Sequence, residues 1–244
     1  MTRDSSLDGR RTFHTTRWSV VARAGGDPRE SRDALEHLCA SYWYPLYAFA
    51  RRRGLEHHAA QDLVQAFFAR LIEKHDLARA DPARGRFRSF LLTALSNFLA
   101  NELDRERAHK RGGDMARLSI DDAEAERRYA NDLATNASPE KLFERQWARE
   151  LIARALSELE SEWGHAGRGA LFARLKPYLT GDASDAKQSE IAQDLALTEN
   201  AVRIALHRLR KRYGELIRLE IADTVADPDD VERELGDLFG ALEA

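Results

Sequence analysis

Apolar residues recur at helical spacing along almost the whole of this 244-residue chain, and no stretch shows the alternation typical of a β-strand. This periodicity restricts the fold to packed helices, so the predicted fold class is all-α. Pro45 is expected to kink or split the first helix, and Gly54 to end it. Ser138-Pro139-Glu140 is typical of a helix start. Helices are predicted at about 31–53, 57–74, 87–107, 138–159, 169–179 and 228–242, and two more, separated by a tight turn, within 189–213.

A polar, acid-rich stretch at 114–136 separates two groups of these helices and is predicted to be a linker containing some helix. The expected organisation is an N-terminal extension (1–30), a first helical domain (31–111), a linker (112–137), a second helical domain (138–222) and an acidic C-terminal extension (223–244).

The formal net charge of −3 conceals strong local differences. Residues 84–111 and 199–213 are basic, whereas residues 220–244 carry nine acids and one base. Cys39 is the only cysteine, which excludes an intrachain disulfide and a cysteine-based zinc site. No apolar run approaches the length of a membrane span, and the first residues do not resemble a signal peptide. A cytoplasmic protein with no membrane partner is therefore expected.

The segment 189–213 predicts a short helix, a tight turn and a second, basic helix, which is the order of a helix-turn-helix. Val202, Leu206, Leu209 and Tyr213 form the apolar stripe of the second helix, and Thr198 is its expected N-cap. The polar face would then read a DNA groove. Its candidate DNA-binding residues are Asn200, Arg203, His207, Arg208 and Lys211.

Residues 61–71 contain Asp62-Leu63-Val64-Gln65 followed by Phe67 and Phe68, and resemble the Asp-Leu-Val-Gln-x-x-Phe signature of extracytoplasmic-function (ECF) sigma factors of bacterial RNA polymerase. Gly85 to Leu91 and the helix after it resemble the next block of that family's promoter-melting domain, sigma region 2. The segment 189–213 resembles the helix-turn-helix of sigma region 4. The blocks occur in the family's order, although Ala196 stands where the turn often has glycine and Ala201 where threonine is common.

The resemblance implies that the chain binds core RNA polymerase and directs promoter recognition and melting, with no cofactor, metal or enzymatic activity. Asp62 and Gln65 would contact core polymerase. The basic recognition helix would read the duplex upstream (−35) element. An anti-sigma factor or other regulator is a candidate partner. Residues implied to contact the melted downstream (−10) element, where a base must be unstacked, are Arg84, Arg86, Arg88, Asn97, Asn101 and Arg105.

Three alternatives remain open at this point. A conventional helix-turn-helix repressor or activator would use the same recognition helix without core polymerase. A metal-dependent helical enzyme could use His58 and Asp62, which lie one helical turn apart. A helical adaptor is the third.

The acidic tail, Glu220 to Ala244, suggests a further hypothesis. Its negative charge could cover the basic recognition helix within the same molecule and restrain DNA binding.

Overall fold

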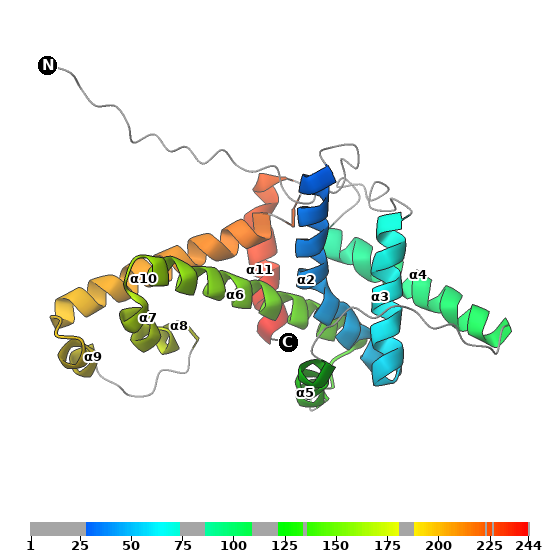
Figure 1. The fold of residues 1–244 in the computed structure, drawn as a ribbon, viewed down its shortest axis with the longest axis horizontal. Coiled ribbons are helices and arrows are strands. Elements are labelled where there is room, and N and C mark those ends of the chain that lie inside the picture. The colour runs from blue at the N-terminus through cyan, green and yellow to red at the C-terminus, as the bar shows by residue number, and fades with distance from the viewer. Residues whose placement is uncertain are drawn as a thin grey trace, which may run out of the picture.

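The computed structural model describes residues 28–73, 86–108, 122–133, 136–180, 188–222, 224–225 and 227–243, and these contain helices and no strand (Figure 1). The all-α prediction is confirmed. The elements are α2 (Pro28–Arg52), α3 (His57–Glu73), α4 (Phe87–Ala108), α5 (Asp122–Asp132), α6 (Pro139–His165), α7 (Gly169–Leu175), α8 (Pro177–Thr180), α9 (Gln188–Asp194), α10 (Glu199–Ala222), the 3-10 turn η3 (Pro228–Asp230) and α11 (Val231–Glu243).

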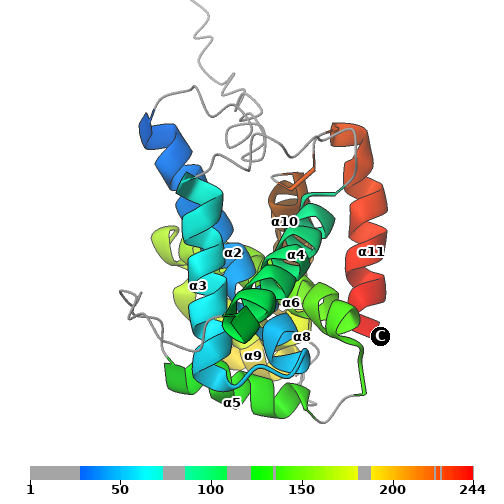
Figure 2. The ribbon, with the colours of Figure 1, turned by 90° about the vertical axis from the view of Figure 1, so that its right-hand side faces the viewer.

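Helix α6 is the central element, and it serves both predicted domains. Its first half packs against α2 and places Trp147 under the start of α4, whereas its second half packs against α7 and α10. Figure 1 shows α2–α5 toward one end of α6 and α7–α9 toward the other, while α10 runs back along α6; in Figure 2 the side with α3 and α4 faces the viewer. The buried apolar residues of both groups form one continuous cluster through α6. The helix begins as expected, because the Lys141 amide donates to the Ser138 hydroxyl at 3.2 Å.

Helix α2 passes through the middle of the first group. Its residues 44–50 are all buried, because α3, α5 and α6 pack around this stretch. The helix continues across Pro45, so of the two predicted outcomes, a kink or a split, the split does not occur. Burial of Leu46, Tyr47 and Phe49, at about 1.5–3 kcal/mol for each aromatic or aliphatic side chain, outweighs the roughly 3 kcal/mol cost of an interior proline.

The predicted linker contributes a helix that docks on α2. In α5, Asp132 accepts hydrogen bonds from the Tyr44 hydroxyl at 3.0 Å and the Gln146 amide at 2.9 Å, and Glu126 accepts one from Tyr47 at 2.7 Å. The Arg128 guanidinium lies 3.7 Å from the centre of the Tyr44 ring. These contacts hold α5 against α2 and α6, so this part of the linker belongs to the packed structure.

Two other predicted boundaries change. The predicted helix 169–179 is divided into α7 and α8 because Pro177, which has no amide hydrogen, begins the second piece. Helix α10, predicted to end at Tyr213, continues to Ala222 because Leu216, Ile217 and Ile221 are buried along its extension. The acidic helix is present as η3 followed by α11, with Leu238 fully buried.

The turns after α2 and α9 share one geometry but differ in their critical residue. Gly54 ends α2 with φ +96°, while Leu55 donates to the carbonyl of Ala50 and Gly54 to that of Arg51. After α9, Ala196 has φ +51°, Leu197 donates to Ala192, and Ala196 donates to Gln193. Both are Schellman turns, in which the left-handed residue is normally glycine. The alanine is therefore tolerated at a cost in strain of about 1–2 kcal/mol.

We expect Ala196→Gly to raise the free energy of unfolding by about 0.5–1 kcal/mol, because relief of the left-handed strain exceeds the entropic cost of glycine. Thermal unfolding should then show a melting temperature about 1–4 °C higher. Ala201→Gly, inside α10, is the matched control and should lower the melting temperature. A lower melting temperature for Ala196→Gly would show that the positive φ is not strained.

Candidate nucleic-acid interface

The polar face of α10 forms one continuous exposed stripe. Asn200, Arg203, His207, Arg208 and Lys211 are all exposed. Asn200, Arg203, His207 and Lys211 follow one another at three or four residues along one side of the helix, and Arg208 lies beside this row. Arg203 donates a 2.6 Å hydrogen bond to the Asn200 side chain. Thr198 caps the helix as expected, accepting from the Ala201 amide at 3.2 Å. The structure therefore brings all five sequence-predicted residues of this face together.

Two other basic residues of the same segment bond to other parts of the protein, although Arg210 is exposed and Arg212 is half-buried. Arg212 forms two hydrogen bonds to Glu162 of α6, at 2.9 and 2.5 Å, and a third to Glu215. Hydrogen bonding to Glu162 raises the pKa of Arg212 above its ordinary value. Arg210 donates to the Tyr178 carbonyl at 3.5 Å. Arg212 thus links α10 to α6, which leaves Arg203, Arg208 and Lys211 as the cations of the exposed stripe.

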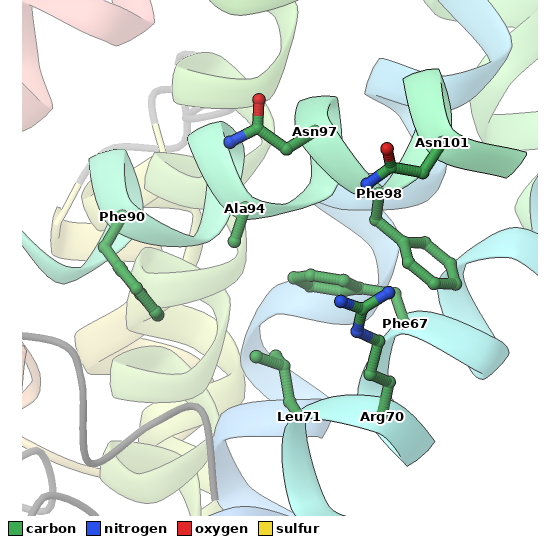
Figure 3. Close-up of a pocket in the computed structure, with 8 residues that line it drawn as sticks. All are labelled: Phe67, Arg70, Leu71, Phe90, Ala94, Asn97, Phe98 and Asn101. Carbon is green, nitrogen blue, oxygen red and sulfur yellow. The ribbon is translucent and has the colours of Figure 1, made fainter. Parts of the chain in front are cut away.

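An open cavity of about 300 Å³ lies between α3 and α4. Its wall is largely apolar, while two of the predicted residues, Asn97 and Asn101, are exposed at its edge. The Arg70 guanidinium lies 5.5 Å from the centre of the Phe98 ring. Figure 3 shows the lining residues, which are Phe67, Arg70, Leu71, Phe90, Ala94, Asn97, Phe98 and Asn101. An apolar wall with amide and guanidinium groups beside it could bind a flat aromatic ring that carries hydrogen-bonding groups at its edge.

Sequence reasoning assigned no role to Arg70, Phe90 or Ala94 at this cavity. The sequence contains one weak indication of the cavity: Arg70 lies three residues after Phe67 and therefore on the same side of α3. Phe67 and Phe68 are buried, as a core position requires. Only the packing of α4 on α3 shows that Phe67 also lines an opening.

The exposed face of α3 carries the other predicted site. Asp62 is exposed and Gln65 is half-buried on this face, away from the buried Leu63, Val64 and Phe67. At the start of the same helix His57 contacts the Tyr47 hydroxyl at 2.7 Å and Glu126 at 3.0 Å, and His58 is exposed. In the part of the chain that the structure describes, no three His, Cys, Asp or Glu side chains are arranged to hold a metal ion.

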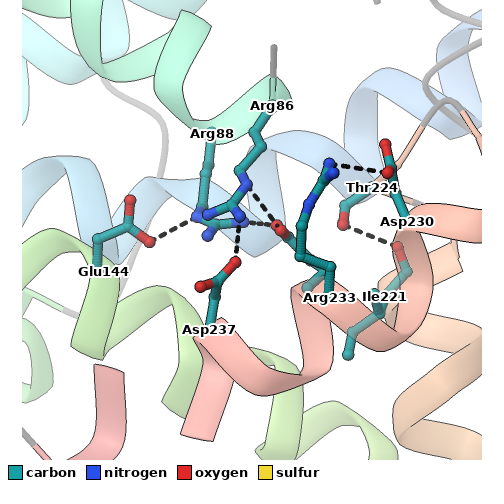
Figure 4. A network of polar contacts seen from close by, with 9 residues as sticks. Arg86, Arg88, Glu144, Ile221, Thr224, Asp230, Arg233 and Asp237 are labelled. Carbon is teal, nitrogen blue, oxygen red and sulfur yellow. Dashed lines mark hydrogen bonds and ion pairs between the residues drawn. The ribbon is translucent and has the colours of Figure 1, made fainter. Parts of the chain in front are cut away.

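Arg86 and Arg88, two of the residues predicted to contact the −10 element, have carboxylate partners within the protein. The Arg88 side chain is 3% exposed, bonds Glu144 of α6 at 2.5 Å, pairs with Glu234 of α11, and lies 4.3 Å from the centre of the Trp147 ring. Arg86 pairs with Asp237 and, at 3.0 Å, with Glu234 (Figure 4 labels Arg86, Arg88, Glu144 and Asp237). Burial lowers the pKa of Arg88, and the Glu144 carboxylate opposes this shift.

The other two predicted −10 residues lie outside what the structure describes. Arg84 falls in the undescribed segment 74–85, and the side chain of Arg105 is likewise not described although its backbone is part of α4.

The hypothesis that the acidic tail covers the recognition helix is wrong. The α11 carboxylates Glu234 and Asp237 pair with Arg86 and Arg88, and Glu232 pairs with Arg218 near the end of α10. Glu220 belongs to α10 itself and bonds Arg154 at 2.9 Å. The tail docks where apolar packing on α6 is available, which a count of charges does not reveal.

Comparison with known families gives a match within the first group of helices. Residues 38–109 match the family model of sigma-70 region 2. The match supports a sigma-70 family factor, and sigma-70 region 2 is a domain of transcription initiation factors that bind RNA polymerase and DNA, not of an enzyme family. It covers most of α2, all of α3 and α4, and thus the cavity between them. Comparisons with curated proteins and with solved structures found no match.

The helices give no indication of a membrane span. Among the described residues, none of them combines the length and the apolar character that crossing a bilayer needs.

We expect Arg212→Ala to lower the free energy of unfolding by about 1–2 kcal/mol, because it removes a two-pronged bond between α10 and α6. Arg208→Ala, on the exposed stripe of the same helix, should change stability by less than about 0.5 kcal/mol. Urea unfolding of both variants measures the difference. Equal stability of the two variants would mean that the Arg212–Glu162 contact does not stabilise the fold.

Proposed function

We propose that this chain is an ECF-type sigma factor that binds core RNA polymerase, reads a duplex upstream promoter element through α10, and holds an unstacked base of the downstream element between α3 and α4. The observation that carries the proposal is the cavity. It lies within the segment that matches sigma-70 region 2, and its edge carries two amides that the family resemblance alone had selected, Asn97 and Asn101.

The cavity has the chemistry needed to hold a base outside the DNA stack. Phe67, Phe90 and Phe98 offer aromatic surface, against which a base ring can pack. Asn97 and Asn101 can each donate to and accept from a base edge. Arg70 carries a positive charge for a neighbouring phosphate. A base must leave the stack to reach such a site, so binding there would stabilise melted DNA.

The stripe on α10 has the chemistry for reading a major groove. Arg203 can donate two hydrogen bonds to guanine, Asn200 can pair with adenine, and Arg208 and Lys211 suit phosphates. Ile204, which is 43% exposed between these polar residues, would add apolar contact with a thymine methyl group. The order of α9, the turn and α10 supports a helix-turn-helix role.

The exposed face of α3 is proposed to contact core polymerase. Asp62 and Gln65 lie three residues apart on that face, and the buried residues behind them fix α3 rigidly on the first group of helices. A rigid polar face suits docking on a preformed protein surface.

Run-off transcription with purified chain and bacterial core RNA polymerase on a genomic promoter library tests this function. We expect promoter-specific transcripts that fall about tenfold or more with Asp62→Ala or Arg203→Ala. Arg127→Ala is the control, since Arg127 is 71% exposed on α5 and pairs with Glu124 of the same helix. Sequence-specific DNA binding without any requirement for core polymerase would instead establish a conventional helix-turn-helix regulator.

Filling the cavity tests the base-holding role separately. Ala94→Leu places three more carbons in the opening and should reduce promoter melting about tenfold or more, since the unstacked base loses its site. Ala100→Leu, on the exposed side of the same helix, should leave melting unchanged. Permanganate reactivity of promoter thymines measures melting. Normal melting by Ala94→Leu, with the fold intact by circular dichroism, would exclude the cavity as the site.

A further inference from the structure

The start of α4 is held by a cluster of charges that comes largely from the C-terminal helix. Arg86 and Arg88 face the carboxylates of Glu234 and Asp237 from α11 and of Glu144 from α6. Glu234 is only 3% exposed and pairs with both arginines. Of the three carboxylates, two therefore belong to a helix about 150 residues away in the sequence.

Helix α11 docks at this place by packing as well as by charge. Leu238 is fully buried, and Val231 and Leu235 pack against the core cluster. The helix contacts α6 and α10, so that it lies between the two groups of helices (Figure 1). Thirteen residues with one apolar stripe make a short helix whose stability depends on remaining docked.

A guanidinium pairs with a carboxylate or a phosphate in the same two-pronged geometry. Arg86 and Arg88 are also the arginines that the family resemblance directs toward the melted promoter strand. While Glu234 and Asp237 pair with them, a DNA phosphate cannot, because Arg88 is buried and both carboxylates would repel the phosphate.

We propose that α11 is an internal ligand that occupies Arg86 and Arg88 in the free protein and is displaced when promoter DNA takes its place. This proposal rests on the proposed function of the first group of helices. Its consequence is that the free chain binds DNA weakly, because the apparent affinity falls in proportion to the fraction of molecules in which α11 is undocked.

The test is DNA binding by the full chain carrying Glu234→Gln together with Asp237→Asn. These changes keep side-chain size and hydrogen bonding while removing both charges that hold the arginines. The matched control is Glu232→Gln with Glu243→Gln, which makes the same change in net charge at exposed positions of α11. Fluorescence anisotropy with a labelled oligothymidylate at low ionic strength measures affinity for a single strand.

We expect the Glu234/Asp237 variant to bind the oligothymidylate about tenfold more tightly than the wild type. The control variant should stay within about twofold of the wild type. Equal affinity of the two variants would overturn the proposal, since the gain would then come from net charge alone. So would unchanged affinity of the Glu234/Asp237 variant with its circular dichroism intact.

Hydrogen exchange on the wild-type chain gives a second test that needs no variant. When the free chain is saturated with oligothymidylate, amides of residues 231–243 should lose protection, and unchanged protection would overturn the proposal. Neither measurement uses polymerase. If run-off transcription fails while these two tests succeed, the proposed sigma function is rejected and the displacement of α11 by nucleic acid stands.

Discussion

The packing of α6 against both groups of helices is the constraint on which the rest of the structure depends. Its 27 residues give buried side chains to α2 at one end and to α7 and α10 at the other. Trp147 lies beneath Arg88, and Trp163 contacts Phe172 at a ring-centre distance of 6.4 Å. Because one rigid helix carries both groups, the cavity between α3 and α4 and the polar stripe on α10 are held in a fixed relation within this structure.

The basic side chains of this chain fall into two groups: some pair with carboxylates and connect helices, and others are exposed. Arg88 and Arg212 bond carboxylates of α6 and so connect helices. Arg203, Arg208 and Lys211 remain exposed along one face of α10. A buried arginine needs a carboxylate partner, because an unpaired charge away from water is very costly. The acids of the C-terminal extension supply partners of this kind for the start of α4.

The cavity and the exposed polar stripe of α10 are built by different means. The stripe follows from periodicity within one helix, so its five residues could be predicted together from sequence. The cavity requires α4 to pack on α3, and no local pattern predicts the gap that remains between Phe67, Phe90 and Phe98. Asn97 and Asn101 were predicted through a family resemblance, whereas Arg70 and Ala94 became visible only through packing.

The sequence by itself determined the all-α class, most helix positions, the caps at Ser138 and Thr198, and the exposed polar residues of α10, because these depend on spacing and on groups a few residues apart. Only the tertiary structure decided that α2 continues across Pro45, that α5 docks on Tyr44 and Tyr47, and that α11 pairs with Arg86 and Arg88. Those outcomes join residues far apart in the chain. They depend on which apolar surfaces meet, and no local pattern encodes that choice.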